Sequence, residues 1–307
     1  LNLKEDSRGR SVNLSSRKIV FPWILWTNIW MSENNPCFQR FFIASDVHID
    51  LEVDIFTFFE HCTDIENKNR IFVLAGDVLT DTFSGINTII DFLVKSLEYF
   101  KDVVFTPGNH DLWDYNISGK NSFDNLFIDA LCKLPTEIGD RIYYLTPDDT
   151  CVVDGIEFWG TTFWSRIDSP IEQLKIGSIN DFYTIKSVND ERLTITYTNM
   201  VNSENRTKLK SFLNYDVDSL PYSVTHRVVV THFPLIREHT PEEYNIFDIY
   251  YNNHMEHFFL DNSKPDLVVN GHTHTKSDFY FNDTRFVCNP RGYPTQSHNF
   301  SVMIVKL

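Results

Sequence analysis

Five short apolar runs in this chain end abruptly in polar residues, and this repeated pattern restricts the possible folds more than any other feature. The runs and the residues that end them are RFFIASDVH at Asp46 and His48, RIFVLAGD at Asp77, DVVFTPGNHD at Asn109 and His110, RVVVTHFP at His232, and PDLVVNGHTH at His272 and His274. Continuous apolar runs of this length are typical of buried strands. The pattern therefore predicts a set of buried strands whose carboxyl ends carry polar side chains.

Helical stretches separate the first three runs. Residues 54–66 and 84–100 are predicted to be helical, the second because Ile86, Ile90 and Leu93 recur at helical spacing. This alternation of strand and helix predicts an α/β fold with parallel strands. Ligands of such sheets bind beyond the carboxyl ends of the strands, which is where all the polar residues fall.

The remaining segments are predicted to be more varied. Residues 141–160 favour antiparallel strands that turn at Asp154–Gly155, and residues 278–290 favour a second hairpin that turns at Asn282–Asp283. A polar insertion is expected around residues 165–225, with a helix at 204–213, and a further helix is expected at 241–260. Residues 300–307 are expected to form the last strand.

The amino end differs from the rest of the chain. We interpret residues 1–38 as a poorly ordered extension and residues 39–307 as a single domain. The apolar segment IVFPWILWTNIW is shorter than the about 20 residues that span a bilayer, and Pro22 interrupts it, so no transmembrane segment is expected. The extension could lie upstream of the natural start, and a membrane-associating leader is the alternative.

The composition limits the partners of the protein. The formal net charge is −15 over 307 residues, and non-specific nucleic-acid binding needs clustered Lys and Arg, so stable nucleic-acid binding is not expected. An anionic substrate would need a local positive centre, which bound divalent cations could supply. The five cysteines form no CxxC pair, which favours reduced thiols in a cytoplasmic protein over a disulfide framework. No sequence feature predicts an oligomeric state.

The strand ends offer a consistent set of metal-binding groups. They are carboxylates, a carboxamide and imidazoles, from Asp46, His48, Asp77, Asn109, His232, His272 and His274. Such oxygen and nitrogen ligands suit Mn, Fe, Zn, Co or Ni better than Ca or a structural, Cys-rich zinc site. Seven ligands, one of them shared, suffice for two divalent cations about 3.5 Å apart. The glycines before Asp77, Asn109 and His272 are expected to allow tight turns and a close approach of the backbone.

Taken together, the motifs resemble the five sequence blocks of the calcineurin-like metallophosphoesterases. The resemblance extends over about residues 41–275, and NPRGYP at residues 289–294 is similar to a tail found in one bacterial-type branch of that family. It implies a four-layer α-β-β-α sandwich with two mixed central sheets and a dinuclear site at the strand carboxyl ends. It also implies that one metal is bound by Asp46, His48, Asp77 and His274 and the other by Asp77, Asn109, His232 and His272, with Asp77 as the bridge.

The activity implied by the resemblance is the hydrolysis of phosphoric esters. A water or hydroxide that bridges two dications has a pKa near neutrality and can attack phosphorus in line. His110 resembles the family's non-ligand histidine and is predicted to be the general acid, oriented by the carboxylate of Asp81 or Asp111. Protein phosphatases of the family carry an aspartate three residues after the bridging one. The presence of Thr80 at that position argues against a protein serine/threonine phosphatase.

The expected substrate is a small phosphomonoester or phosphodiester, contacted by Asn109, His110 and Arg291. Arg291 could instead hold the carboxyl-terminal turn, and both roles are open. Two other functions are alternatives: a non-catalytic binding module on the same fold, and a nuclease of the same superfamily, which the acidic balance disfavours. His254 and His257 lie three apart on a predicted helix with no third ligand, and we interpret them as part of a solvated face.

Overall fold

The computed structural model describes residues 3–5, 11–13, 40–51, 57–62, 68–80, 85–176, 179–187, 191–216, 223–237, 248–251, 253–296, 300–301 and 303–307. The chain divides into two units, Leu1–Cys37 and Phe38–Leu307. Within the first unit, β1 (Leu3–Glu5) pairs antiparallel with β2 (Ser11–Asn13), and most of the predicted extension lies outside the described residues. The second unit contains all other described elements.

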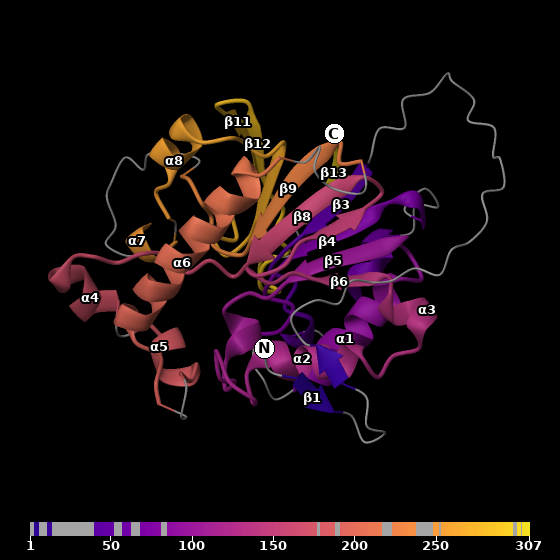
Figure 1. The fold of residues 1–307 in the computed structure, drawn as a ribbon, viewed down its shortest axis with the longest axis horizontal. Coiled ribbons are helices and arrows are strands. Elements are labelled where there is room, and N and C mark those ends of the chain that lie inside the picture. The colour runs from indigo at the N-terminus through magenta and orange to yellow at the C-terminus, as the bar shows by residue number, and fades with distance from the viewer. Residues whose placement is uncertain are drawn as a thin grey trace. The chain divides into compact units, whose positions relative to one another are not determined.

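Two mixed sheets form the centre of the second unit (Figure 1). The first has the strand order β13-β3-β4-β5-β6, in which β3 (Arg40–Ala44), β4 (Ile71–Ala75), β5 (Asp102–Thr106) and β6 (Ile142–Tyr144) are parallel and β13 (Ile304–Lys306) is antiparallel. The second has the order β11-β12-β10-β9-β8-β7. Its inner strands β8 (Ile156–Thr161), β9 (His226–Thr231), β10 (Leu267–Asn270) and β12 (Thr284–Cys288) are parallel, and β7 (Cys151–Val153) and β11 (Ser277–Phe281) are antiparallel edges. The predicted pair of mixed sheets is confirmed.

Alternating side chains of the strands fill separate apolar cores, because successive residues of a strand point to opposite faces of the sheet. Phe41 and Ile43 of β3 belong to a core that also contains Phe158 and Val228 of the other sheet. Their neighbour Phe42 belongs to a different core on the outer face of the first sheet. The strands are therefore apolar throughout because both of their faces are covered.

Helices cover the two outer faces. The helix α1 (Gly85–Ser96) adds Phe92 and Leu93 to the outer core of the first sheet. On the second sheet, α6 (Ile195–Asn214) and α8 (Glu256–Asp261) add Phe212 and Phe259 to a core around Trp159. Figure 1 shows α1 beside the first sheet and α6 beside the second. Helix, sheet, sheet and helix make the four layers that were predicted.

Several helices differ from the sequence predictions in length. Within the expected helix 54–66, the described part is the 3-10 helix η2 (Thr57–Cys62), and the expected helix 241–260 is represented by two short helices, α7 (Asp248–Tyr251) and α8. The insertion helix α6 begins well before the predicted residue 204, because the Thr194 side chain accepts a hydrogen bond from Tyr197 N and caps it. Further helices are η1 (Ile49–Leu51), η4 (His110–Leu112), α2 (Phe123–Leu131), α3 (Thr136–Gly139), α4 (Pro170–Ile176) and α5 (Asp181–Thr184).

Both predicted hairpin turns are present. Asp154 and Gly155 join β7 to β8, and Asn282 and Asp283 join β11 to β12, and all four residues have positive φ, as the favoured two-residue turns require. The expectation for residues 141–160 was wrong in one respect. The strand β6 lies parallel to β5 in the first sheet, so the chain changes sheets between β6 and β7 instead of continuing an antiparallel series.

No helix within the described ranges is long and apolar enough to cross a membrane. Four cysteines lie in those ranges and form no disulfide: Cys62, Cys132, Cys151 and Cys288. The finding agrees with the scattered cysteine positions in the sequence.

The core between the sheets should depend strongly on Phe158. Its ring is fully buried and meets Phe41 edge to face at a centroid distance of 6.0 Å. Replacing Phe158 by Ala should lower the free energy of unfolding by about 3–5 kcal/mol, because it leaves a cavity between two sheets that cannot collapse. Chemical denaturation measures the change. Tyr280, which is 70% exposed, is the control, and Tyr280→Ala should change stability by less than about 0.5 kcal/mol. Equal losses in the two variants would contradict the proposed core.

Candidate metal centre

The seven predicted ligands all follow the carboxyl ends of parallel strands. Asp46 and His48 follow β3, Asp77 follows β4, and Asn109 follows β5 in the first sheet. His232 follows β9, and the pair His272 and His274 follows β10 in the second sheet. Because the two sheets face each other, residues far apart in the sequence meet at one end of the sandwich.

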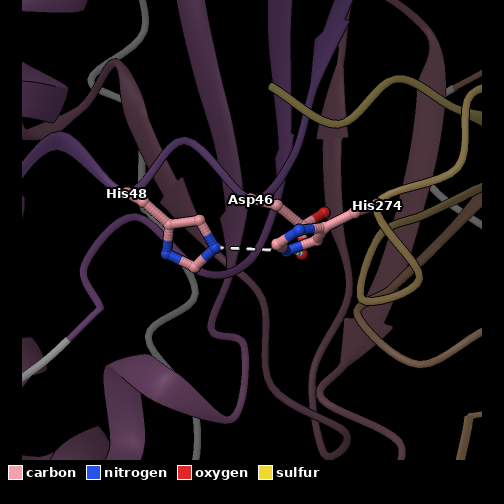
Figure 2. Close-up of side chains that lie close together, drawn as sticks. All are labelled: Asp46, His48 and His274. Carbon is pink, nitrogen blue, oxygen red and sulfur yellow. Dashed lines mark hydrogen bonds and ion pairs between the residues drawn. The ribbon is translucent and has the colours of Figure 1, made fainter. Parts of the chain in front are cut away.

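A first cluster contains Asp46, His48 and His274 (Figure 2). His48 Nε2 lies 3.2 Å from His274 Nε2, and His274 Nε2 lies 3.3 Å from Asp46 Oδ1. One candidate ligand atom from each residue falls within 4.8 Å of the others. Two imidazole nitrogens and a carboxylate oxygen that converge in this way form a suitable set for a divalent transition metal.

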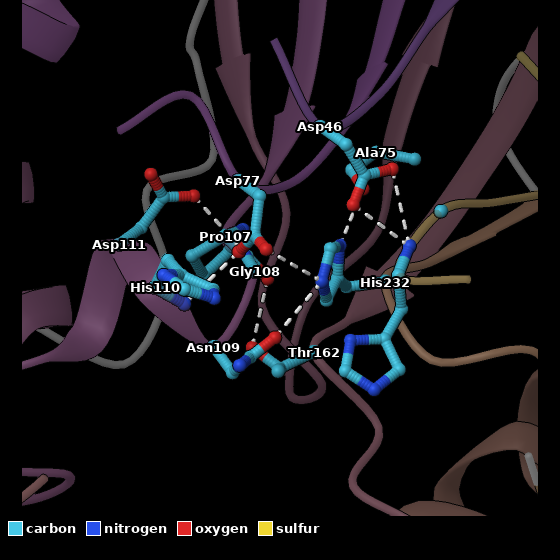
Figure 3. Close-up of polar contacts among 12 residues, drawn as sticks. Asp46, Ala75, Asp77, Pro107, Gly108, Asn109, His110, Asp111, Thr162 and His232 are labelled. Atoms are coloured by element: carbon cyan, nitrogen blue, oxygen red, sulfur yellow. Dashed lines mark hydrogen bonds and ion pairs between the residues drawn. The ribbon is translucent and has the colours of Figure 1, made fainter. Parts of the chain in front are cut away.

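A second cluster lies beside it and contains Asp77, Asn109 and His232 (Figure 3). His232 Nε2 is 3.2 Å from Asp77 Oδ2 and 3.0 Å from Asn109 Oδ1. Asp46 also approaches this cluster, since its ligand atom lies within 4.8 Å of those of Asp77 and His232. The two clusters are thus adjacent, and the bridging role of Asp77 stays a prediction.

His272 completes the arrangement. Its backbone N–H donates to both carboxylate oxygens of Asp46, at 3.0 and 3.1 Å, and its ring stacks on Phe233. Its Nε2 is buried and has no hydrogen-bond partner among the described residues. Buried polar atoms are nearly always satisfied, so this imidazole nitrogen is a candidate to bind a cation.

The backbone is strained at five of the seven candidate ligands. Asp46, His48, Asp77, His272 and His274 have φ between 46° and 71°, in the left-handed region that residues with a Cβ rarely adopt. Such conformations cost on the order of 1–3 kcal/mol each and cluster at functional sites. The strain therefore supports a function for these five positions beyond packing.

Two glycines are required by close approaches, as predicted. A Cβ on Gly108 would lie 2.0 Å from Asp77 Oδ1, and one on Gly271 would lie 2.7 Å from Asp46 Oδ2. No side chain can therefore be present at either position without displacing a carboxylate. The glycines allow the backbone to pack directly against the two buried acids.

The charges of the side chains favour protons on two histidines. Burial alone would lower the pKa of His232, but the adjacent Asp77 carboxylate raises it to about 9. Burial opposes the proton on His274 as well, but its hydrogen bond to Asp46 raises the pKa above the ordinary value. In the opposite direction, His232 holds the pKa of Asp77 well below its usual range, although burial would raise it. Cations can replace these protons, because metal binding requires neutral imidazole.

The other two histidines favour the neutral form. Burial lowers the pKa of His48 to about 4, and burial together with the neighbouring His232 lowers the pKa of His272 well below its ordinary value. Neutral imidazole is the form that binds metal. These two side chains are therefore ready to act as ligands near neutral pH.

Outer contacts hold three of the candidate ligand rings in place. Their Nδ1 atoms lie 3.1 Å from Thr80 Oγ1 for His48, 2.8 Å from the Ala75 carbonyl for His232, and 2.8 Å from Gln296 Oε1 for His274. Each contact leaves Nε2 directed at the centre, which is how metal-binding histidines are usually fixed. These contacts of Thr80 and Gln296 were not predicted, because neither residue lies in a motif that specifies a contact.

His110 lies beside the ligands. Its backbone N–H donates to Asp77 Oδ1 at 2.9 Å, its Nδ1 is 2.8 Å from the Thr80 carbonyl, and its ring lies on that of Trp113 with centroids 4.0 Å apart. Asp111 accepts hydrogen bonds from the backbone N–H groups of Gly108, Val78 and Leu79.

Burial raises the pKa of Asp111 to about 7, and the nearby charge of Asp77 adds to the shift. The described hydrogen bonds of the Asp111 side chain are thus made with the backbone next to Asp77 and Asn109. The other candidate for orienting His110, Asp81, lies outside the described residues.

Arg291 is buried beneath the first ligand turn. Its Nη1 donates to the Val47 carbonyl at 3.1 Å, its backbone N–H donates to Ser45 O, and Gly292 N donates to Asp46 O. These contacts give a physical basis for the alternative in which Arg291 holds a turn. Its contact with substrate stays a prediction.

A cavity of about 510 Å³ opens over the clusters. Asp77, Asn109, His110, His272 and His274 line it, together with the aromatic side chains of Trp113, Tyr250, Tyr251 and Tyr293. The insertion contributes Ile179, Asn180 and Asp181. The pair His254 and His257 is elsewhere: His254 precedes α8 and does not lie on it, His257 is exposed on that helix, and neither belongs to the clusters described above.

Solved structures share this architecture. The phosphopantetheinyl hydrolase PptH from Mycobacterium tuberculosis superposes with a TM-score of 0.61 at 17% sequence identity, over 88% of this chain and 96% of that chain. At this identity the likeness shows the fold. In sequence, a protein of Acanthamoeba polyphaga mimivirus, "Uncharacterized protein L509", is 28% identical over 248 residues, which are 77% of this chain and 84% of the viral protein.

The sequence profile of the calcineurin-like phosphoesterases matches residues 39–276. This range contains all seven candidate ligands and His110, and it covers most of both central sheets. The chain belongs to the calcineurin-like phosphoesterase family.

Proposed function

We propose that this protein is a metal-dependent hydrolase of small phosphate esters. The observation that carries the proposal is the meeting of ligand-type side chains from five strand ends. The ligand atoms of Asp46, His48, Asp77, His232 and His274 form two adjacent clusters. Asn109 Oδ1 lies against His232, and the ring of His272 lies beside the His232 ring. Asp46, His48 and His274 would hold one divalent cation, Asn109, His232 and His272 would hold the other, and Asp77 would be shared. The donor set suits Mn, Fe, Zn, Ni or Co.

Two cations bound there would lower the pKa of a water molecule toward neutrality, bind phosphoryl oxygens and offset the charge that develops during in-line displacement. The chain itself supplies the proton for the leaving oxygen. Donation from His110 Nδ1 to the Thr80 carbonyl, 2.8 Å away, leaves Nε2 as the atom that holds and releases this proton. Contact with the Trp113 ring fixes the plane of the imidazole.

Orientation of His110 is then assigned to the Thr80 carbonyl. Asp111 supports His110 less directly, through its hydrogen bonds to Gly108 N and to the backbone after Asp77. Any residue at position 80 offers a backbone carbonyl, so this hydrogen bond to His110 does not require an aspartate side chain there. It explains how the site tolerates Thr80 where protein phosphatases have an aspartate.

The cavity favours a substrate with one phosphoryl group. Its volume of about 510 Å³ suits a small molecule, and Lys and Arg are absent from the described residues that line it. Only the cations and His110 would then balance the negative charge of the substrate. The additional phosphate groups of a polyphosphate or a nucleic-acid strand would find no further positively charged side chain in the described lining of the cavity. The aromatic walls favour an apolar or planar leaving group. Monoesters and diesters with one phosphorus both meet these conditions.

A substrate panel tests this preference. With Mn²⁺, Ni²⁺ and Zn²⁺ added in turn, kcat/KM should be higher for an aryl phosphate, a nucleoside monophosphate, a cyclic nucleotide or a phosphopantetheinyl ester than for a nucleoside triphosphate or an oligonucleotide. The phosphopantetheinyl ester is included because the mycobacterial neighbour is named after that group. If the oligonucleotide is instead the preferred substrate, and its cleavage weakens as the salt concentration rises, the protein is a nuclease.

Replacement of His110 by Ala should separate proton transfer from metal binding. Turnover of esters with a poor leaving group should fall by about 10²–10⁴-fold, while the Mn²⁺ content stays at the wild-type value, because His110 is not a proposed ligand. Steady-state kinetics and metal analysis of the same preparation measure both quantities. His257→Ala, at an exposed position of α8, is the matched control and should leave both unchanged. Undiminished turnover in H110A would rule out its role as the acid.

Metal binding should appear as added stability. At free Mn²⁺ 100-fold above Kd, the free energy of unfolding should rise by about 2.7 kcal/mol for each occupied site. In His272→Ala this increment should shrink, because one site loses a ligand, whereas His257→Ala should retain it in full. Denaturation with and without Mn²⁺ gives the increments. An increment in H272A equal to that of the wild type would exclude His272 as a ligand.

A further inference from the structure

Asp181 is the meeting point of three hydrogen-bond donors next to the proposed metal centre. It begins α5 in the polar insertion, and only 1% of its surface is exposed. Its Oδ1 accepts from Asn109 Nδ2 at 3.0 Å and from Trp113 Nε1 at 2.9 Å, and its Oδ2 accepts from the Tyr250 hydroxyl. A buried carboxylate has only acceptor sites, so all three partners must present N–H or O–H groups to it.

The contact with Asn109 decides which way its amide faces. An asparagine amide can present oxygen or nitrogen to a given side, and only the oxygen can bind a cation. With Nδ2 held by Asp181, Oδ1 faces the centre, 3.0 Å from His232 Nε2. We propose that Asp181 is a positioning residue that fixes the amide of Asn109 with its oxygen toward the metal. This inference rests on the proposed function, specifically on the second cation of the proposed pair.

The other two donors extend the effect of Asp181 to the walls of the cavity. The indole N–H of Trp113 is held by the same carboxylate oxygen as Asn109, and the Trp113 ring supports His110. Tyr250, held by Oδ2, packs its ring edge to face against Phe233, next to the ligand His232. The carboxylate of Asp181 therefore connects the candidate ligand Asn109, the Trp113 ring beside His110, and Tyr250 of α7, which lines the cavity.

The segment that carries Asp181 is itself anchored. Asp114 N donates to Thr184 O at 3.0 Å, and Ile117 N donates to Lys186 O at 2.8 Å. These backbone hydrogen bonds connect the end of α5 and the residues just after it to the residues that follow His110. Asp181 is thus held against the turn that it positions, as a residue that orients a metal ligand must be.

The test compares Asp181→Asn with a matched control. Asparagine keeps the size but presents an NH₂ group in place of one acceptor oxygen. Toward Asn109 and Trp113 this group would oppose two N–H donors, and toward Tyr250 it forces the hydroxyl to accept. A neutral amide oxygen also accepts more weakly than a carboxylate, so the Asn109 amide should be held less firmly. Titration calorimetry with Mn²⁺ should find one of the two sites weakened by roughly 10- to 100-fold, the usual effect of removing an outer partner of a ligand. Asp124→Asn is the control, because Asp124 also accepts a hydrogen bond from a tyrosine hydroxyl, that of Tyr144, away from the ligand clusters. Its Mn²⁺ affinities should equal those of the wild type.

A swapped pair provides the sharper result. In the N109D/D181N double variant, the new carboxylate presents oxygen to the metal whichever way it turns, so its direction no longer depends on position 181. N109D alone is the reference for the affinity that the added charge contributes. The weakened site should recover most of its affinity, which a general structural defect in D181N would not allow. Wild-type affinity at both sites in D181N, or no recovery in the double variant, would overturn the proposal. Should D181N fail to fold, the double variant is decisive alone: it should fold and bind two Mn²⁺ ions.

The readout does not require turnover, so it separates this inference from the proposed function. If no ester is hydrolysed while D181N weakens one Mn²⁺ site and the double variant restores it, the activity proposal fails and the role of Asp181 holds. If the wild type hydrolyses esters while D181N binds both ions normally, the activity proposal holds and the role of Asp181 fails.

Discussion

Buried negative charge at the carboxyl ends of the strands is the constraint on which the rest of the site depends. Asp46 and Asp77 are both buried, and an ionised carboxylate without compensation is very costly in such a position. Backbone N–H groups of His272 and His110 donate to them, and the side chains of His274 and His232 lie within ion-pair distance. The chain can therefore balance this charge with protons on imidazole, and divalent cations can take over that role.

The left-handed turns at the candidate ligands are a consequence of this arrangement. Each acid must face the centre directly after a buried strand, which leaves one or two residues for the change of direction. Neighbouring turns then hold one another: Asp46 N donates to Gly76 O at 2.9 Å, His48 N to Asp77 O at 3.2 Å, and Gly271 N to His232 O at 3.0 Å. Local strain of this kind persists only where the surroundings fix it, and here apolar cores on both faces of each sheet do so.

The sequence was sufficient for the parts of the fold and site that are encoded locally. Buried parallel strands are continuous apolar runs, and a ligand at a strand end is adjacent to its run, so Asp46 or His272 can be found without knowledge of the fold. The short strand β6 could not be placed, because only its pairing with β5 distinguishes a parallel strand from a hairpin arm. The outer contacts of Thr80, Gln296 and Asp181 were missed for a similar reason: they depend on residues brought together by topology.

The polar insertion shows why low hydrophobicity does not mean low order. The helix α6 buries Thr198, Asn202 and Asn205, so its inner face is partly polar and the helical pattern of the sequence is weak before residue 204. Asn202 Nδ2 donates to Asn253 Oδ1 and Trp164 O, and Asn253 donates in turn to Pro234 O, two residues after His232. Hydrogen bonds are directional, whereas apolar contacts are not, so such a face can fix the loops around a site in one arrangement. An insertion built from polar contacts is therefore suited to hold ligand-bearing loops, and the position of Asp181 beside Asn109 follows the same principle.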